Sequence, residues 1–215
     1  TPGSEVTVLH NGIDAAAWRP TSPATSRPAG PLRVVLAMRF TPRKRPLSVV
    51  DIVRRARSRS AVPITVEICG GGPLLGLVRR VVARRGWSDW VHLPGRIDRE
   101  QLVEHYLAAD VYLASSRYES FGIAALEGRT VGLPLRGSGA EDFVTDGIDG
   151  LVRDGGEGLV AGLVELAQDR ALVRRLRRHN ETVVPDQGGA QVLGALAREY
   201  ARALARAVPG PTPPL

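Results

Sequence analysis

Short apolar runs alternate with longer amphipathic runs along most of this 215-residue chain. Six of the short runs are nearly all apolar and rich in β-branched residues, as expected of strands that are covered on both faces. They are residues 32–38, 64–70, 90–95, 110–116, 133–138 and 150–154. A seventh run of this kind, at residues 6–10, precedes them.

The runs between these predicted strands have apolar residues at helical spacing. They are residues 46–59, 73–85, 98–109 and 122–131, and two of them carry proline at or near the first turn. Strands and helices that alternate in this way predict a doubly wound α/β fold. We expect a parallel sheet of six strands with helices on both of its faces.

The ends of the chain do not follow this alternation. After residue 156 the pattern is only helical, in amphipathic segments at residues 158–169, 171–182 and 190–207. Residues 19–31 are rich in proline and serine and separate the first residues from the main sheet. We therefore expect an interdomain segment and linker at residues 1–31, a Rossmann-like binding domain with C-terminal helices at 32–208, and a flexible tail at 209–215.

The composition is that of a globular chain with an excess of arginine. The net charge of +7 could attract nucleic acids or anionic small molecules. The arginines occur in pairs along the predicted helices and aromatic residues make up only 5% of the chain, so we expect no nucleic-acid partner. The single cysteine, Cys69, excludes an intrachain disulfide. No apolar run reaches the ~18 residues of a membrane span and no signal peptide opens the sequence, so we expect a cytoplasmic protein.

In a doubly wound sheet, ligands bind beyond the carboxyl ends of the strands, so the loops after the strands carry the candidate chemistry. The first of these loops contains Arg39 and Lys44, and Lys44 is the only lysine among 29 basic residues. These two flexible cations could hold a diphosphate, the lysine as a point charge and the arginine as a planar fork. A solvated basic loop is the alternative, and the sole lysine favours the ligand site.

The second loop is rich in glycine. Gly71 and Gly72 follow a predicted strand and precede a predicted helix, whose N-terminus favours anions. Glycines at this place let a backbone or a ligand approach closely, and a plain tight turn explains them equally well.

The third loop begins where Gly95 ends a predicted strand. Asp98 can cap the helix that follows, with Gln101 placed for a capping box. Helix capping explains most of this turn. A second candidate role for this turn is a contact between the backbone of Gly95, Arg96 and Ile97 and a nucleotide base.

The fourth loop leads into the predicted helix at residues 122–131. Ser120 can cap this helix, which leaves the amides of Phe121, Gly122 and Ile123 open. The N-terminus of a helix attracts anions, and Gly122 has no side chain to block an approaching phosphate.

Two carboxylates accompany this helix start. Glu127 falls on the same helical face as Ile123 and Leu126, on or beside an apolar stripe, where a carboxylate needs a partner. Glu119 precedes the helix, which rises roughly 9 Å from Phe121 to Glu127. This span is too long for the paired carboxylates of a retaining glycosidase, at ~5 Å, and suits one carboxylate at each end of an extended polyhydroxyl ligand. Spacing alone does not distinguish such a site from a capped surface helix with two incidental glutamates.

Taken in order, these segments resemble the nucleotide-sugar-binding C-terminal domain of the family-4 retaining glycosyltransferases, which have the GT-B fold. "ESFGIAALE" looks like their E-x7-E motif, "LHNGID" like the interdomain N-G-[IV]-D segment, and "MRFTPRKRP" like the G-R-x4-K-[GA] loop. "CGGGP" resembles the G-x-G-P turn, "AADVYLASSRYESFG" the run that ends in E-x-F-G, and "DGIDGLV" the D-G-x-x-G-x-L-V turn. Ordered motifs at the family spacing are far more specific than any single motif.

The resemblance implies a role for each candidate residue. Arg39 and Lys44 match the basic pair that neutralises the donor diphosphate. Glu119 matches the carboxylate that contacts the hydroxyls of the donor sugar, and Glu127 the one that contacts the ribose, while the amides of residues 121–123 would contact the sugar or the phosphates. The implied reaction is a retaining transfer from a UDP- or GDP-sugar, without a metal ion or a permanently bound cofactor. In it the leaving diphosphate helps to deprotonate the acceptor.

Enzymes of this family also carry an N-terminal acceptor-binding domain of similar size. This chain begins at the segment that resembles the interdomain part, so we expect a donor-binding domain that pairs with such an acceptor domain and is inactive alone. The resemblance is also compatible with contact to a lipid acceptor at the cytoplasmic face of a membrane. A non-catalytic nucleotide-sugar-binding or partner-interaction module and a GT-B nucleotide-sugar epimerase are the alternatives that stay open.

Overall fold

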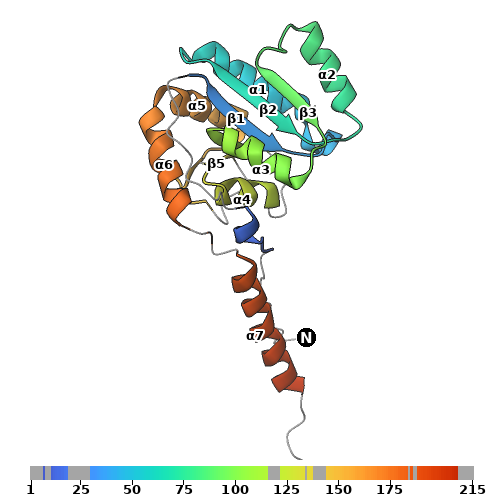
Figure 1. Ribbon diagram of the computed structural model, residues 1–215, viewed down its shortest axis with the longest axis vertical. Coiled ribbons are helices and arrows are strands. Elements are labelled where there is room, and N and C mark those ends of the chain that lie inside the picture. The colour runs from blue at the N-terminus through green and yellow to red at the C-terminus, as the bar shows by residue number, and fades with distance from the viewer. Residues whose placement is uncertain are drawn as a thin grey trace, which may run out of the picture.

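The computed structural model describes residue 7 and residues 11–18, 30–115, 122–133, 135–137, 144–183, 185 and 188–207. Its strands are β1 (Leu32–Ala37), β2 (Ile64–Cys69), β3 (Val91–Gly95), β4 (Val111–Ala114), β5 (Leu135–Gly137) and β6 (Gly150–Val152). They form one parallel sheet in the order β3-β2-β1-β4-β5-β6 (Figure 1). The predicted α/β fold with six parallel strands is confirmed. The seventh run, at residues 6–10, lies outside the described residues except for residue 7.

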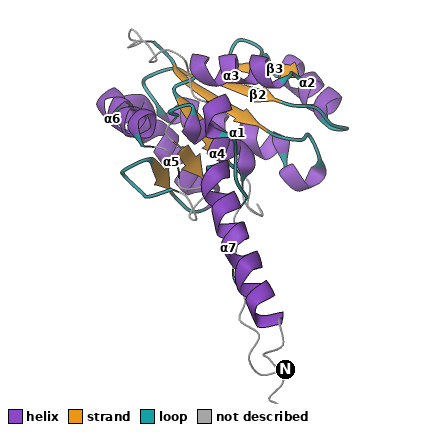
Figure 2. Ribbon diagram, turned by 60° about the horizontal axis from the view of Figure 1, so that its bottom comes forward, coloured by secondary structure: helices purple, strands orange, loops and turns teal. Residues whose placement is uncertain are grey.

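Helices connect the strands and cover both faces of the sheet. They are α1 (Pro46–Arg59), α2 (Leu75–Arg84), α3 (Arg99–Ala108), α4 (Ile123–Thr130), α5 (Gly155–Gln168), α6 (Arg170–Thr182) and α7 (Gly189–Ala207), with a short 3-10 helix, η2 (Pro42–Lys44), after β1. The helices α1 and α5 pack side by side on one face, and α3 and α4 lie on the other (Figures 1 and 2). Every helix that the periodicity predicted is present.

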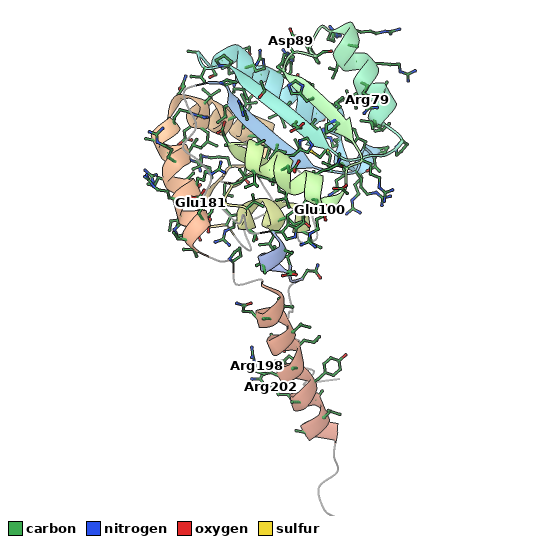
Figure 3. The ribbon with its side chains drawn as sticks, in the orientation of Figure 1. Arg79, Asp89, Glu100, Glu181, Arg198 and Arg202 are labelled. Carbon is green, nitrogen blue, oxygen red and sulfur yellow. The ribbon has the colours of Figure 1, made fainter. Side chains whose placement is uncertain are left out.

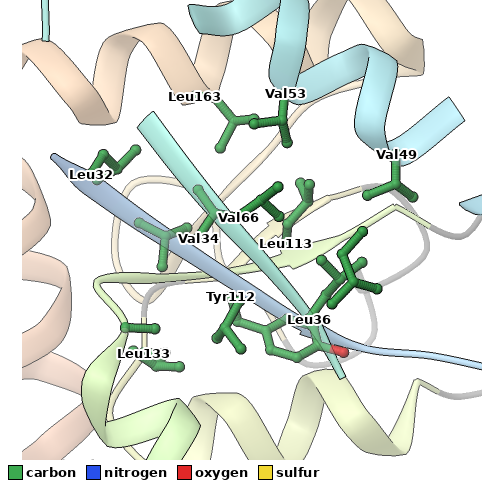
Figure 4. Close-up of a cluster of buried hydrophobic side chains, with 14 of the residues drawn as sticks. Leu32, Val34, Leu36, Val49, Val53, Val66, Tyr112, Leu113, Leu133 and Leu163 are labelled. Carbon is green, nitrogen blue, oxygen red and sulfur yellow. The ribbon is translucent and has the colours of Figure 1, made fainter. Parts of the chain in front are cut away.

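The hydrophobic core lies on both faces of the central strands. In β1 the apolar residues at positions 32–36 are at most 2% exposed. Val53 of α1 and Leu163 of α5 cover one face of the strands, and Leu133 lies beyond the other face (Figure 4). Burial on both faces explains why the strands are nearly all apolar rather than alternating.

The centre of the sheet is also the point where the strand order reverses. Val34 of β1 is in register with Val66 of β2 on one side and with Val111 of β4 on the other. The helices that follow β1 and β4 leave towards opposite faces, and the loops in front of them therefore diverge. A crevice forms at the carboxyl ends of the strands at such a point.

Buried polar contacts fasten the half of the sheet that contains β5 and β6. Nη2 of Arg129 on α4 lies 2.9 Å from Oδ2 of Asp149, and both side chains are buried. The amide of Thr145 donates to Oδ1 of the same aspartate. Nδ2 of Asn180 on α6 donates to the carbonyls of Leu133 and Asp149, at 3.0 and 2.9 Å. These contacts fix α4 relative to β6 and α6.

The segment at residues 11–18 packs on the domain, beside the start of α7. Ile13 forms a bridge with Gly188 and accepts a hydrogen bond of 2.7 Å from the amide of Gly189. Trp18 is 6% exposed, and its ring centre lies 5.9 Å from that of Tyr106 on α3. The division into residues 1–31, 32–208 and 209–215 stays a prediction.

The helix α7 extends away from the sheet (Figures 1 and 2). Arg198 and Arg202 lie together on one side of it (Figure 3). An apolar stripe on this helix is exposed and consists of Leu193, Leu196, Tyr200 and Leu204. In the part of the chain that the structure describes, no helix has the length and apolar character needed to cross a membrane.

Leu113→Ala in β4 should lower the free energy of unfolding by about 2–5 kcal/mol, because a fully buried side chain is replaced by a cavity. Urea denaturation followed by circular dichroism measures this loss. Leu193→Ala on α7 is the matched control, since that leucine is 66% exposed, and it should cost less than ~0.5 kcal/mol. Equal losses in the two variants would contradict the placement of the core.

Candidate functional site

A cleft of about 780 Å³ lies at the carboxyl ends of β1, β2 and β4, where the strand order reverses. Its walls come from the loops after the first four strands, which are far apart in the sequence. The predicted site residues among its lining are Arg39, Lys44, Gly71, Gly72, Arg96, Ile97, Gly122 and Ile123. The fold therefore brings candidates from all four predicted loops to one place.

The loop after β1 supplies the two predicted cations. Pro42 begins η2, which ends at Lys44, and the amide of Lys44 donates to the carbonyl of Thr41 at 3.1 Å. The side chain of Arg39 is exposed and that of Lys44 is partly buried. Because both side chains line the cleft, the two cations can act on one bound anion.

Arg45 is the residue of this loop that the sequence analysis missed. Its φ of 49° and ψ of 54° fall in the left-handed region, and no other non-glycine residue in the described part of the chain has a positive φ. Glycine adopts this conformation at little cost, whereas a side chain strains it. The signal was present in the motif, because the resembled pattern has glycine or alanine directly after the lysine.

The glycines after β2 allow two backbones to approach closely. A Cβ on Gly70 would collide with the carbonyl oxygen of Met38, and one on Gly72 would lie 2.7 Å from that of Phe40. The amide of Phe40 donates to the carbonyl of Gly71 at 2.9 Å. Of the two explanations left open for these glycines, close backbone contact accounts for Gly72. Gly71 has ordinary space for a Cβ and lines the cleft.

The turn after β3 contains the predicted capping box. The side chain of Asp98 accepts from the amide of Gln101 at 2.8 Å, and the side chain of Gln101 accepts from the amide of Asp98 at 3.2 Å. Arg96 and Ile97 precede this cap and line the cleft, whereas Gly95 is not among the lining residues. The φ of 92° at Gly95 gives this glycine a structural role in ending the strand.

The start of α4 differs from the prediction. The helix begins at Ile123 with Gly122 as its N-cap residue, so the prediction that Ser120 caps it is wrong. The backbone of Gly122 is in the left-handed region, with φ 75° and ψ 44°, and the helical conformation begins at the next residue. The amides of Gly122, Ile123 and Ala124 donate to no acceptor among the described residues. All three residues line the cleft. The segment before Gly122, with Phe121, lies outside the described residues, so the open helix end stays a prediction.

Glu127 lies one turn along α4 from Ile123, behind the residues that line the cleft. Burial raises the pKa of this carboxyl to about 7, and the guanidinium of Arg99 on α3 acts in the opposite direction. The same guanidinium lies 5.3 Å from the ring centre of Trp18. Arg99 thus acts electrostatically on Glu127, and the effect of burial on the pKa outweighs it. The sequence analysis missed it because it comes from another helix.

Two further ionisable groups near the cleft stay neutral at physiological pH. Burial, with a smaller contribution from Glu67, raises the pKa of Cys69 to about 12. Burial also raises the pKa of Tyr106, with further contributions from Tyr112 and Glu127. A protonated thiol is a poor nucleophile. Within the described ranges, no three His, Cys, Asp or Glu side chains converge as a set that could hold a metal ion.

Three predicted site residues lie outside the described residues. They are Glu119, Ser120 and Phe121. The contacts predicted for Glu119 and Phe121 with a donor sugar therefore stay predictions.

A parallel six-stranded sheet with this cleft is the architecture of the C-terminal half of a GT-B glycosyltransferase. Residues 20–183 match the family model of the glycosyl transferases group 1, and the chain belongs to this family. It is 32% identical to the D-inositol 3-phosphate glycosyltransferase of Mycolicibacterium smegmatis, over 94% of this chain and 48% of that protein. The corresponding protein of Thermobispora bispora is 29% identical, over 95% of this chain and 52% of that protein. The chain spans about half the length of these curated relatives.

Solved structures share the fold at lower identity. Sucrose-phosphate synthase from Thermosynechococcus elongatus superposes with a TM-score of 0.77 at 20% identity, over 95% of this chain and 54% of that one. HepE from Anabaena, solved in complex with UDP and glucose, superposes with a TM-score of 0.74 at 18% identity, over 91% of this chain and 57% of that one. At these levels of identity, both similarities show a shared fold and nothing further.

Glu127→Gln should change how stability depends on pH. The folded pKa of about 7 lies above the ordinary 4.5, so the stability contributed by the neutral carboxyl is fully present below pH 4.5 and is lost as the pH rises through about 7. The amide variant does not titrate. Between pH 5 and pH 8 the wild type should therefore lose on the order of 1 to 2 kcal/mol relative to the variant, by urea unfolding. A difference that stays constant with pH would contradict the raised pKa.

Proposed function

We propose that this domain is the donor-binding half of a retaining glycosyltransferase. Its ligand would be a sugar that is linked to UDP or GDP. The observation that carries the proposal is the meeting of Arg39 and Lys44 with the first residues of α4, from Gly122 to Ala124, at one cleft. The cations follow β1 and the amides follow β4, so the two sets of donors come from the two sides of the strand-order reversal. A diphosphate between them would be held by charge from one side and by backbone hydrogen bonds from the other.

The nucleoside would extend from the diphosphate towards the turn after β3. Ile97 and Leu102 supply apolar surface there, and Arg96 lies beside them. The ribose would lie nearest to α4, where Glu127 accepts from its hydroxyls. With its pKa raised to about 7, this carboxyl can accept a hydrogen bond in either protonation state.

The transfer step would depend on the charge that develops on the leaving diphosphate. The bond between the anomeric carbon and the diphosphate oxygen breaks, and its electron pair goes to the diphosphate. The acceptor oxygen bonds to the anomeric carbon on the same face of the sugar, and its proton goes to a diphosphate oxygen. Arg39, Lys44 and the amides of α4 would stabilise that diphosphate, and Glu119 would hold the sugar hydroxyls.

We assign the acceptor site to a second, N-terminal domain. This chain spans about half the length of its curated relatives, and transfer requires an acceptor held within ~3.5 Å of the anomeric carbon. The exposed apolar stripe on α7, from Leu193 to Leu204, is a surface that such a domain would cover. The chain alone would then bind the donor and leave the sugar untransferred.

UDP and UDP-glucose are the first ligands to test, because HepE was solved with UDP and glucose. Lys44→Ala should weaken the binding of UDP by ~1.5 to 3 kcal/mol, the range of a charge-assisted hydrogen bond. Lys44→Arg should restore this loss only in part, since a planar fork does not reproduce a compact point charge. Isothermal titration calorimetry measures both changes, and an unchanged affinity in Lys44→Ala would mean that this loop is only a solvated surface.

The two glutamates should differ in their effects on binding. Glu127→Ala should weaken UDP and UDP-glucose alike, through the ribose that both ligands carry. Glu119→Ala should weaken only UDP-glucose, because the sugar is absent from UDP. Each side-chain hydrogen bond to a hydroxyl is worth about 0.5–1.5 kcal/mol, or up to ~3 kcal/mol when the carboxylate is ionised. Calorimetry of both ligands without added metal tests the pair, and no binding of either ligand at millimolar concentration would overturn the proposed function.

A further inference from the structure

The segment at residues 11–18, which precedes the sheet in the sequence, runs from the cleft to α3. Asn11, its first residue, lines the cleft. Ile13 is 7% exposed and anchors the segment to the domain. The short 3-10 helix η1 (Ala15–Ala17) follows and brings Trp18 against α3. The segment therefore borders the donor site at one end and packs on a neighbouring helix at the other.

Trp18 contacts two residues of α3. The guanidinium carbon of Arg99 lies 5.3 Å from the ring centre of Trp18, and the ring centre of Tyr106 lies 5.9 Å from it. Arg99 is exposed and forms no ion pair with a residue that the structure describes. An indole face attracts a guanidinium, so Trp18 restricts the positions that this flexible side chain can take.

The guanidinium of Arg99 acts on Glu127 of α4. Burial raises the pKa of this carboxyl to about 7, and the charge of Arg99 lowers it. The arginine thus favours the ionised carboxylate. Arg99 is not among the residues that line the cleft, so its effect on a ligand would pass through Glu127. Whatever fixes the guanidinium therefore influences how far Glu127 ionises near neutral pH.

The other ionisable groups behind the cleft do not supply this charge. Tyr106 interacts electrostatically with Glu127, and also with Tyr112 of β4 and Cys69 of β2. Burial raises the pKa of Tyr106 and that of Cys69, so both side chains stay uncharged near neutral pH.

The charged residues on the other sides of α4 are paired with one another. On α6, which packs against α4, Nε of Arg177 lies 3.1 Å from Oε1 of Glu181. Arg129 of α4 itself is paired with Asp149 at 2.9 Å. Among the described side chains, Arg99 is therefore the charge to which Glu127 responds.

We propose that Trp18 is a positioning residue of the donor site, whose ring holds the guanidinium of Arg99 towards Glu127 and so favours the carboxylate that accepts from the ribose. An ionised carboxylate accepts hydrogen bonds more strongly than a neutral carboxyl does. The segment before the sheet would then contribute to the site through α3. The ribose contact rests on the proposed function, whereas the coupling of Trp18 to Glu127 rests on the contacts of Arg99.

The coupling is tested first without a ligand, by carbon-13 NMR of the Glu127 carboxyl carbon, assigned with Glu127→Gln. In the wild type this signal should titrate with a midpoint of about 7. Arg99→Gln and Trp18→Leu should each raise the midpoint by roughly half to one pH unit, because the charge that favours the carboxylate is removed or released. Trp18→Phe should raise it less, since a phenyl face still attracts a guanidinium, though more weakly than an indole.

The double variant Trp18→Leu/Arg99→Gln separates coupling from two independent effects. It should raise the midpoint no further than Arg99→Gln alone, because Trp18 acts through the guanidinium. A midpoint that rises by the sum of the two single changes would overturn the proposal.

Trp90→Leu is the matched control. Trp90 is 7% exposed, and the guanidinium carbon of Arg57 lies 5.0 Å from its ring centre, so it repeats the burial and the cation contact of Trp18. It precedes β3 at the amino end of that strand, whereas the cleft lies at the carboxyl ends. The midpoint of Glu127 should not change in this variant. An equal rise in Trp90→Leu would assign the effect to a general loss of packing and overturn the proposal.

Calorimetry with UDP-glucose tests the consequence for binding, because the diphosphate of this ligand carries no proton that titrates near neutral pH. At pH 7, Trp18→Leu and Arg99→Gln should each bind it roughly two- to fivefold more weakly than the wild type. At about pH 8.5 the loss should largely disappear, since the carboxylate then forms in every variant. A loss of the same size at both pH values would contradict an effect of charge and indicate a displaced segment.

The two readouts separate this proposal from the proposed function. If UDP-glucose fails to bind while the midpoint still follows Trp18 and Arg99, the proposed function fails and the coupling stands. If UDP-glucose binds and the midpoint is unchanged in both Trp18 variants, the coupling fails and the proposed function stands. Circular dichroism checks that each variant is folded, and Trp18→Phe decides the role of the ring if Trp18→Leu is not.

Discussion

The parallel pairing of β1 with β2 on one side and β4 on the other is the constraint on which the rest of the structure depends. It places the reversal of strand order at the middle of the sheet, and it sends the connecting helices to opposite faces. The loops after β1 and β4 must then diverge, so the carboxyl edge of the sheet has a cleft at this point rather than a packed surface. Both the cations and the start of α4 reach that cleft because of this pairing.

Backbone contacts hold the loops around the cleft in place. Gly70 and Gly72 lie so close to residues 38–40 that a side chain would not fit, and hydrogen bonds join the two loops. The main chains of the loops after β1 and β2 are therefore in direct contact at the cleft, which Arg39 and Lys44 also line.

Much of the fold could be predicted from the sequence, because strands and helices follow local periodicity. The predicted helix at residues 46–59 has the bounds of α1, and the capping box of Asp98 and Gln101 is present. The order of the motifs also located eight of the residues that line the cleft, including Lys44 and Gly122. The predicted cap of α4 was wrong because two nearby residues could precede the helix as its cap. Ser120 is a good capping residue, yet the left-handed Gly122 takes that position in the structure.

The sequence by itself determined the elements and the loops in which charged residues gather, since these depend on residues close together in the chain, and the alternation of strands and helices indicated the parallel sheet. Only the tertiary structure decided which loops share a cleft and which groups face one another. Arg99 acts on Glu127 because α3 and α4 lie on the same face of the sheet, and burial raises the pKa of the carboxyl. Arg45 stands beside the start of α5 for the same reason, because α1 packs against α5 across a long stretch of chain. No local pattern encodes such contacts, because they exist only after the sheet has brought distant segments together.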